Sequence, residues 1–176
     1  TVEELHADGA HLGAGVYEVG RADLGDEIGR GVDLFLRRGW EGGGVEATLF
    51  TNRIRGFVAF EPTGQEDPPS GLPVFRYVAT DARFQGGEIT ADLRPGGLAE
   101  GLSLRLGLDW VRAERADALG TPLPSIPPLR GRIQLRLDRE RGWLGATFRG
   151  VAAQNRVAPA EDPTDGYFLV DVSAGM

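Results

Sequence analysis

Carboxylate pairs, clustered glycines and two histidines are the residues of this sequence that could support chemistry. The adjacent acids Glu66 and Asp67 lie in a proline-rich stretch, where nothing positions them for acid–base catalysis. The glycine run at 42–44 lies in a predicted turn and not between a strand and a helix, so it gives no sign of a bound cofactor. The absence of cysteine excludes disulfides and thiolate metal sites. The sequence therefore predicts that the protein is not an enzyme.

Both histidines, His6 and His11, lie in a polar N-terminal stretch that continues as GVYEVGRADLGDE at residues 15–27. This stretch has too many glycines and carboxylates for a core element. It runs directly into VDLFLRR at residues 32–38, where apolar and polar residues alternate. We interpret it as a long polar loop that precedes a strand.

Length and charge narrow the class of protein further. A chain of 176 residues is long enough for one sizeable domain. The formal net charge of −7 argues against a nucleic-acid partner, which usually requires a basic face. No stretch approaches the roughly 18 consecutive apolar residues of a transmembrane helix.

Alternation with a period of two residues is the dominant pattern and predicts about seven strands. Helical periodicity with caps at both ends is not sustained anywhere in the sequence. Several of the alternating segments are longer than the five or six residues usual for a sandwich strand. The segments lie at residues 32–36, 45–49, 89–93, 102–110, 133–137, 143–156 and 168–172.

The connections between these segments alternate between short and long. Such asymmetry is typical of an up-and-down antiparallel meander with tight turns at one end and large loops at the other, as in outer-membrane barrels. In a barrel the apolar rows face lipid and the charged rows face a wet lumen, whereas in a soluble sheet the apolar rows face a core. A soluble or surface-exposed β-sheet ligand-binding module therefore stays open as the alternative. The short connections are at 39–43, 95–100 and 139–142, and the long ones at 1–29, 61–75, 117–128 and 158–166.

Two tryptophans lie at or beside the predicted tight turns. Trp40 and Trp143 are placed where an aromatic girdle would meet a membrane interface. Packing within a hairpin is the alternative for each of them.

Several stretches resemble signatures of TonB-dependent outer-membrane receptors, in the order of that family. Residues 18–27, EVGRADLGDE, are similar to the family pattern E-x-G-N-P-D-L-x-x-E, with Arg21 and Ala22 in place of Asn-Pro. The other stretches are LFTNRIRGFVAFEPTG, LPVFRYVATDARFQGGEITADL, LPSIPPLRGRIQLRL and RGVAAQNRVAPAEDPTDGYFLVDVSAGM.

This resemblance implies an all-β fold, in which residues 1–176 are the C-terminal portion of a 22-stranded barrel whose plug domain and last strands are absent from the chain. It also implies a place in the bacterial outer membrane, surrounded by lipid, and uptake of a metal ion or metal complex that is energised by the TonB complex through the missing plug domain. Arginines on the charged rows are then expected to face the lumen and to pair with Asp109, Asp138 or plug carboxylates. These arginines are Arg105, Arg132, Arg136 and Arg149.

Residues 6–18 are most similar to a subgroup of the family associated with zinc uptake, through the pattern YADG-x-H-x-A-x-x-x-Y-E-x-G. The resemblance implies that Asp8, His11 and Glu18 contact the ligand, with His11 and Asp8 as metal ligands. Zinc is then a transported substrate and no resident cofactor is expected. Imidazole and carboxylate suit zinc, but a zinc site needs three or four ligands, so others would come from outside this stretch. The alternative is that both histidines are solvated loop residues.

Overall fold

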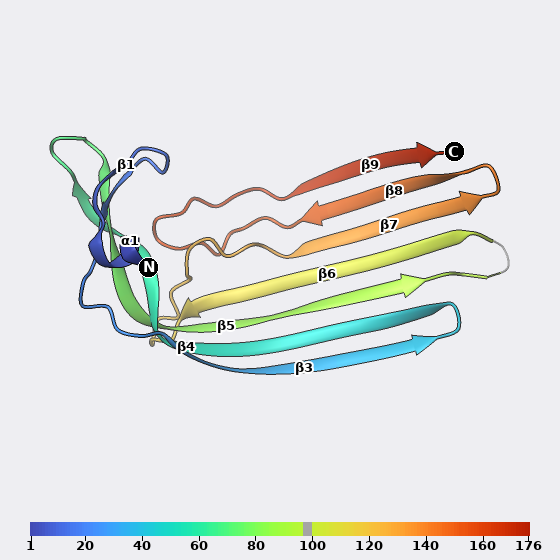
Figure 1. The fold of residues 1–176 in the computed structure, drawn as a ribbon, viewed down its shortest axis with the longest axis horizontal. Coiled ribbons are helices and arrows are strands. Elements are labelled where there is room, and N and C mark those ends of the chain that lie inside the picture. The colour runs from blue at the N-terminus through green and yellow to red at the C-terminus, as the bar shows by residue number, and fades with distance from the viewer. Residues whose placement is uncertain (97–99) are drawn as a thin grey trace.

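The computed structural model describes residues 1–96 and 100–176, in which a short helix is followed by a single sheet of nine strands (Figure 1). Helix α1 (Val2–His6) is capped by Thr1, whose side chain accepts a hydrogen bond from the backbone N–H of Glu4. No helix within the described residues is long and apolar enough to cross a membrane. The strands are β1 (Asp8–His11), β2 (Val16–Val19), β3 (Ile28–Trp40), β4 (Gly43–Glu66), β5 (Pro73–Leu93), β6 (Leu102–Arg115), β7 (Arg130–Arg139), β8 (Gly142–Val151) and β9 (Tyr167–Gly175).

The seven strands from β3 to β9 confirm the predicted antiparallel meander, each strand pairing with the next along the chain. Their tight turns gather at one end of the sheet and their long connections at the other (Figure 1). Two residues join β3 to β4 and two join β7 to β8. The predicted tight turn at 95–100 lies partly outside the described residues. Within the described part of the chain, β3 and β9 each have a single neighbour, so the sheet is open.

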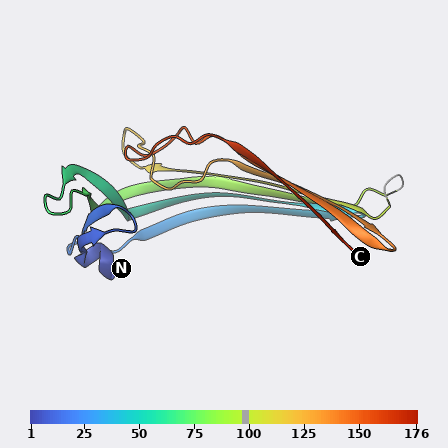
Figure 2. The same cartoon turned by 90° about the horizontal axis from the view of Figure 1, so that it is seen from above.

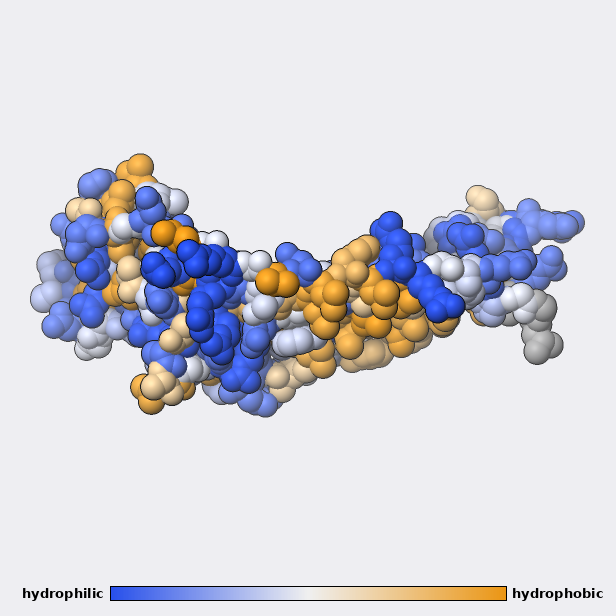
Figure 3. Space-filling model, turned by 90° about the horizontal axis from the view of Figure 1, so that it is seen from below, coloured by the Kyte–Doolittle hydropathy of each residue, from blue (hydrophilic) through white to orange (hydrophobic). Residues whose placement is uncertain are grey.

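One face of this sheet, called here the outer face, carries an apolar band across its middle. Directly opposed residues of antiparallel strands lie on the same face, so the register can be followed from strand to strand. One such row contains Ala91, Leu106, Ile133, Phe148 and Val170. In Figure 3 hydrophobic residues form a band across the middle of the molecule, with hydrophilic residues toward both ends. A lipid-facing barrel wall has this distribution.

The opposite face, called the inner face, carries the charged rows, and its arginines pair mostly across neighbouring strands. Arg136 lies 2.8 Å from Asp138, as predicted. Asp109 does not pair with any of the four arginines named in the prediction. It pairs instead with Arg130, at 2.8 Å. Further cross-strand pairs on this face are Arg37 with Glu46, Arg105 with Asp92 and Arg149 with Asp171.

Very little of the described chain is buried, and most of the buried side chains are small. A soluble domain of this length would bury well over half of the surface that its unfolded chain exposes. Here no large side chain among residues 1–96 and 100–176 is fully buried. The sheet is bowed and has no second layer (Figure 2). These features contradict a soluble sandwich and are those of a barrel wall. The buried apolar residues are Val16, Ala59, Ala82, Ala113, Leu123 and Ala158.

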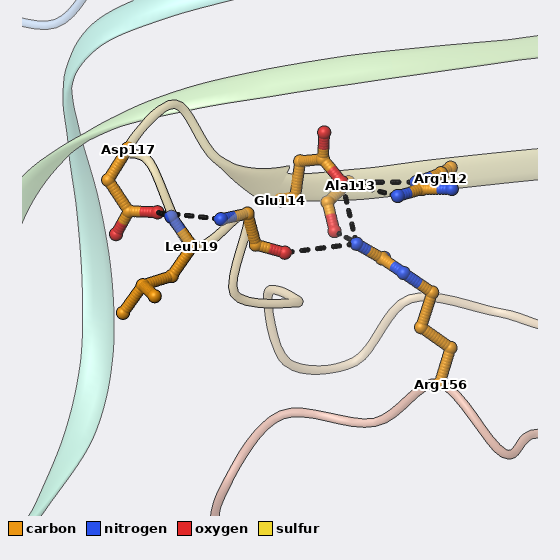
Figure 4. A network of polar contacts seen from close by, with 7 residues as sticks. Arg112, Ala113, Glu114, Asp117, Leu119 and Arg156 are labelled. Atoms are coloured by element: carbon orange, nitrogen blue, oxygen red, sulfur yellow. Dashed lines mark hydrogen bonds and ion pairs between the residues drawn. The ribbon is translucent and has the colours of Figure 1, made fainter.

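The long connections fold back against the sheet. Leu123, from the connection between β6 and β7, packs on Ala82 and Ala113 of the inner face. From the connection between β8 and β9, Arg156 reaches the end of β6, where its Nη2 lies 2.6 Å from Glu114 (Figure 4). Arg156 also donates to the carbonyl oxygens of Ala113 and Gly120, so both loops are tied to β6.

The two tryptophans predicted to lie at a membrane interface are on different faces of the sheet. Trp40 is exposed at the tight-turn end and lies on the outer face, where a girdle residue would lie. Trp143 is opposed to Asp138 on the inner face, and the guanidinium of Arg136 lies 4.3 Å from its ring centroid. For Trp143 packing within the hairpin is therefore the correct reading, stabilised by a cation–π contact.

Two stretches predicted as loops contain strands, and in that respect those predictions are wrong. The stretch at 1–29 contains β1 and β2, and β2 pairs in parallel with β5. The stretch at 61–75 is mostly the continuation of β4 and β5, which are 24 and 21 residues long. Pro62 is tolerated there because the register shifts between Pro62 and Glu66, and proline is accommodated at such irregularities.

Candidate functional site

The predicted ligand-binding residues lie on a small hairpin, β1–β2, at the long-loop end of the sheet. Gly15 closes the turn with a φ of +67°, a conformation that glycine adopts at no steric cost, and its N–H donates to the carbonyl of His11. The hairpin is attached to the extended part of β5 through the parallel pairing of Tyr17 with Val74 and Glu18 with Phe75. The hairpin is thereby held against the sheet and does not hang free.

His11 and Glu18 lie on the same face of this hairpin and contact each other. His11 is opposed to Val16 and Glu18 to Gly9, so the two side chains are diagonal neighbours. The His11 Nδ1 lies 2.7 Å from the Glu18 Oε1. The second carboxylate oxygen of Glu18 accepts a hydrogen bond of 3.3 Å from the Tyr77 hydroxyl. Glu18 is therefore fixed from both sides, while the imidazole is 60 % exposed.

Asp8 lies on the opposite face of the hairpin, apart from His11. Its carboxylate accepts a hydrogen bond of 2.9 Å from the Tyr17 hydroxyl. Successive residues of a strand point to opposite faces, so positions 8 and 11 of one strand cannot present side chains on the same side. Of the three predicted residues, the structure brings His11 and Glu18 together and leaves Asp8 separate.

The two faces differ in what they offer a metal ion. With Nδ1 engaged by Glu18, the Nε2 atom of His11 is available, and a carboxylate behind a ligating histidine is the common arrangement at metal sites. His6 is exposed in the last turn of α1 and joins neither face. Across residues 1–96 and 100–176, no group of three or more histidine, aspartate or glutamate side chains is placed to hold a metal. The hairpin therefore supplies a metal site with one exposed imidazole, that of His11, which the carboxylate of Glu18 supports.

Two tyrosines of the site were missed by the sequence reasoning. Tyr17 adjoins a predicted ligand residue in the sequence, which is a local signal. Tyr77 lies 59 residues after Glu18, and nothing in the sequence connects them. Tyr77 also lies beside Phe60, with a separation of 4.7 Å between ring centroids, and Phe60 stacks on Phe75 at 5.0 Å. An aromatic cluster therefore borders Glu18.

The hydrogen bond to Asp8 raises the pKa of Tyr17 above its ordinary value of 10.0. Since the raised pKa favours the neutral phenol in the folded protein, this hydrogen bond contributes fully below pH 10 and is lost as the pH rises through the higher folded value. Replacing Asp8 by asparagine removes the carboxylate and is expected to lower the tyrosinate titration midpoint, followed by ultraviolet absorbance. Asp23→Asn is the matched control, because Asp23 pairs with Arg21. Equal shifts in both variants would contradict the assignment.

Comparison with known proteins gives one family match that covers the whole chain. Residues 1–176 match the family described as TonB dependent receptor-like, beta-barrel.

Solved structures of transporters share the fold of this chain. The copper transporter OprC is 21% identical with a TM-score of 0.77, and the match covers 88% of this chain and 24% of that one. The siderophore receptor PirA from Acinetobacter baumannii is 15% identical with a TM-score of 0.66, covering 91% and 27%. The FrpB iron transporter from Neisseria meningitidis (F3-3 variant) is 15% identical with a TM-score of 0.62, covering 90% and 26%. The chain spans about a quarter of the length of each of these proteins.

Proposed function

We propose that this chain, which belongs to the TonB-dependent receptor-like β-barrel family, is the C-terminal portion of an outer-membrane receptor for a metal ion or metal complex. The family is one of receptors and not of enzymes, as the sequence predicts, and its barrels lie in the outer membrane. The open edges at β3 and β9 support a partial barrel, because an unpaired strand edge in lipid leaves backbone groups unsatisfied. Further strands from the rest of the receptor would pair with them.

The observation that carries the metal proposal is the contact of 2.7 Å between His11 and Glu18. A carboxylate that accepts the Nδ1 proton fixes the ring orientation and makes Nε2 the better donor to a metal. Zinc suits this imidazole and is the substrate we propose, with its remaining ligands supplied by other parts of the receptor. Glu18 thereby acts as a positioning residue, and Asp8 is outside this coordination sphere.

A metal complex with an aromatic chelator is the second candidate. The ring cluster of Phe60, Phe75 and Tyr77 lies next to Glu18 and offers a surface for stacking. Solved structures with this fold include a siderophore receptor and a copper transporter. TonB, reached through a plug domain elsewhere in the receptor, is the proposed energy-coupling partner for either substrate.

Uptake measurements in cells test the proposal. Cells that produce the full receptor are expected to accumulate radiolabelled zinc at low external concentration, and deletion of TonB is expected to abolish this accumulation. Unlabelled copper and a ferric catecholate serve as competitors that separate the two candidates. Zinc uptake that is the same with and without the receptor would overturn the zinc assignment, and competition by the ferric catecholate alone would favour the aromatic complex.

A further inference from the structure

Three arginines lie directly opposite one another across the outer face of the sheet. Arg30 of β3 is opposed to Arg53 of β4, and Arg53 is opposed to Arg83 of β5. We call these three residues the outer arginine row. Like charges placed directly opposite each other on a sheet are destabilising, so such a row calls for a compensating anion.

The protein supplies little of that compensation. No residue of the outer arginine row makes an ion pair within the described part of the chain. The next residue along the same register is Glu114, opposed to Arg83. Glu114 already accepts hydrogen bonds from Arg112 at 2.9 Å and from Arg156 at 2.6 Å (Figure 4). Its single charge is therefore shared by two other guanidinium groups.

Two residues of the row, Arg30 and Arg53, line a hollow of about 390 Å³ on the same face. Asp81 is the one carboxylate in its lining, and it accepts a hydrogen bond of 3.2 Å from the N–H of Gly56. The lining contains Arg55 in addition to Arg30 and Arg53, so three arginines and one aspartate give it a net charge of +2 (3 − 1). Nearby Glu27 is engaged with the N–H of Val58 at 2.7 Å. The lining residues are Ile28, Arg30, Arg53, Arg55, Asp81 and Ala116.

The position of the row relative to the apolar band indicates what kind of anion it meets. Along the outer face of β4, Leu49 is followed by Thr51 and then Arg53, and on β5 Gly87 is followed toward the long loops by Gln85 and then Arg83. The surface thus changes from apolar to polar to cationic within four residues of each strand. The same order, apolar then polar then charged, is found in a membrane on going from the hydrocarbon core to the charged headgroups.

We propose that the outer arginine row and the adjoining hollow bind the phosphate group of an anionic lipid in the outer leaflet. Guanidinium groups pair bidentately with phosphate, and several of them around one hollow bind it more strongly than any alone. The lipid tails then lie along the apolar band immediately below. This site lies on the outer face and is separate from the hairpin that carries His11, so it goes beyond the proposed uptake function.

Lipid retention by the full receptor, purified in neutral detergent without added metal, tests this proposal by native mass spectrometry. Three probes are added separately: phosphatidic acid, diacylglycerol with the same tails, and inorganic phosphate. Phosphatidic acid is expected to be retained in preference to both of the others. The variant Arg53→Gln/Arg83→Gln is expected to weaken that retention by roughly 30-fold, from a factor of about 5 to 6 for each arginine near the membrane surface. Arg53→Lys/Arg83→Lys should retain an intermediate affinity, because charge is kept and bidentate geometry is lost.

The matched control is Arg38→Gln/Arg132→Gln, which removes the same charge from the far end of the outer face and from the inner face. It should bind phosphatidic acid like the unmodified receptor. Equal loss in both double variants, or diacylglycerol bound as well as phosphatidic acid, would overturn the proposal. Inorganic phosphate bound as well as the lipid would reduce the row to a simple anion site and would also overturn it. Because the measurement involves no metal and no transport, failure of the uptake proposal leaves its outcome unchanged.

Discussion

Replacing His11 by alanine is expected to weaken zinc binding to the full receptor by on the order of 100-fold. Loss of an outer partner of a ligating histidine costs about 10- to 100-fold in metal affinity, and loss of the ligating atom itself should reach the upper end of that range. The structural reason is the exposed imidazole whose Nδ1 faces Glu18 at 2.7 Å, which leaves Nε2 as the donor. Competition with a chromophoric chelator measures the affinity directly.

Glu18→Gln separates positioning from ligation. The glutamine amide can still contact Nδ1 but carries no charge, so we expect a loss of about 10-fold, at the lower end of the range for outer-shell partners. A zinc affinity that is unchanged in this variant would show that Glu18 does not position the imidazole.

His6→Ala is the matched control, since His6 is the other histidine of the chain and lies in α1 away from the His11–Glu18 contact. It is expected to bind zinc like the unmodified receptor. Equal losses in His6→Ala and His11→Ala would point to non-specific binding by exposed imidazoles. An unchanged affinity in His11→Ala would remove His11 from the site.

The barrel wall could be predicted from the sequence because its determinants are local. Alternation in segments such as 102–110 reports which residues share a face, and the turns at 39–43 and 139–142 are too short for anything but antiparallel neighbours. The same pattern left open whether the apolar face meets lipid or a core. The single layer of the sheet, in which no large side chain of the described residues is fully buried, and the family match favour lipid.

The candidate site could be predicted only in part because its geometry is non-local. The strands β1 and β2 have four residues each. They are too short for an alternation of apolar and polar residues to be recognised among the surrounding glycines. The sequence alone places Asp8 and His11 together in one loop, whereas the strand register places them on opposite faces. The contact between Glu18 and Tyr77 depends on the parallel pairing of β2 with β5, which no local pattern indicates.

The wall is closely packed at Gly86 of β5, and replacing this glycine by alanine is expected to reduce the free energy of unfolding by about 1–3 kcal/mol. A Cβ at this position would lie 2.5 Å from the ring of Phe50 and 2.7 Å from the carbonyl oxygen of Trp110. The ring can rotate, but the carbonyl belongs to the β5–β6 ladder, where Gly86 is opposed to Val111. The ladder must therefore open to accept the methyl group.

Gly107→Ala on the neighbouring strand β6 is the matched control, because a Cβ at Gly107 would meet nothing within 4 Å. That variant should be neutral or slightly stabilising, since alanine restricts the unfolded chain more than glycine does. Urea unfolding of the full receptor in detergent, followed by heat-modifiable gel mobility, gives both free energies. If the two variants unfold at the same urea concentration, the contact at Gly86 does not limit the packing of the wall. If Gly86→Ala alone unfolds earlier, close approach of β5 and β6 at this glycine is a requirement for the folded barrel.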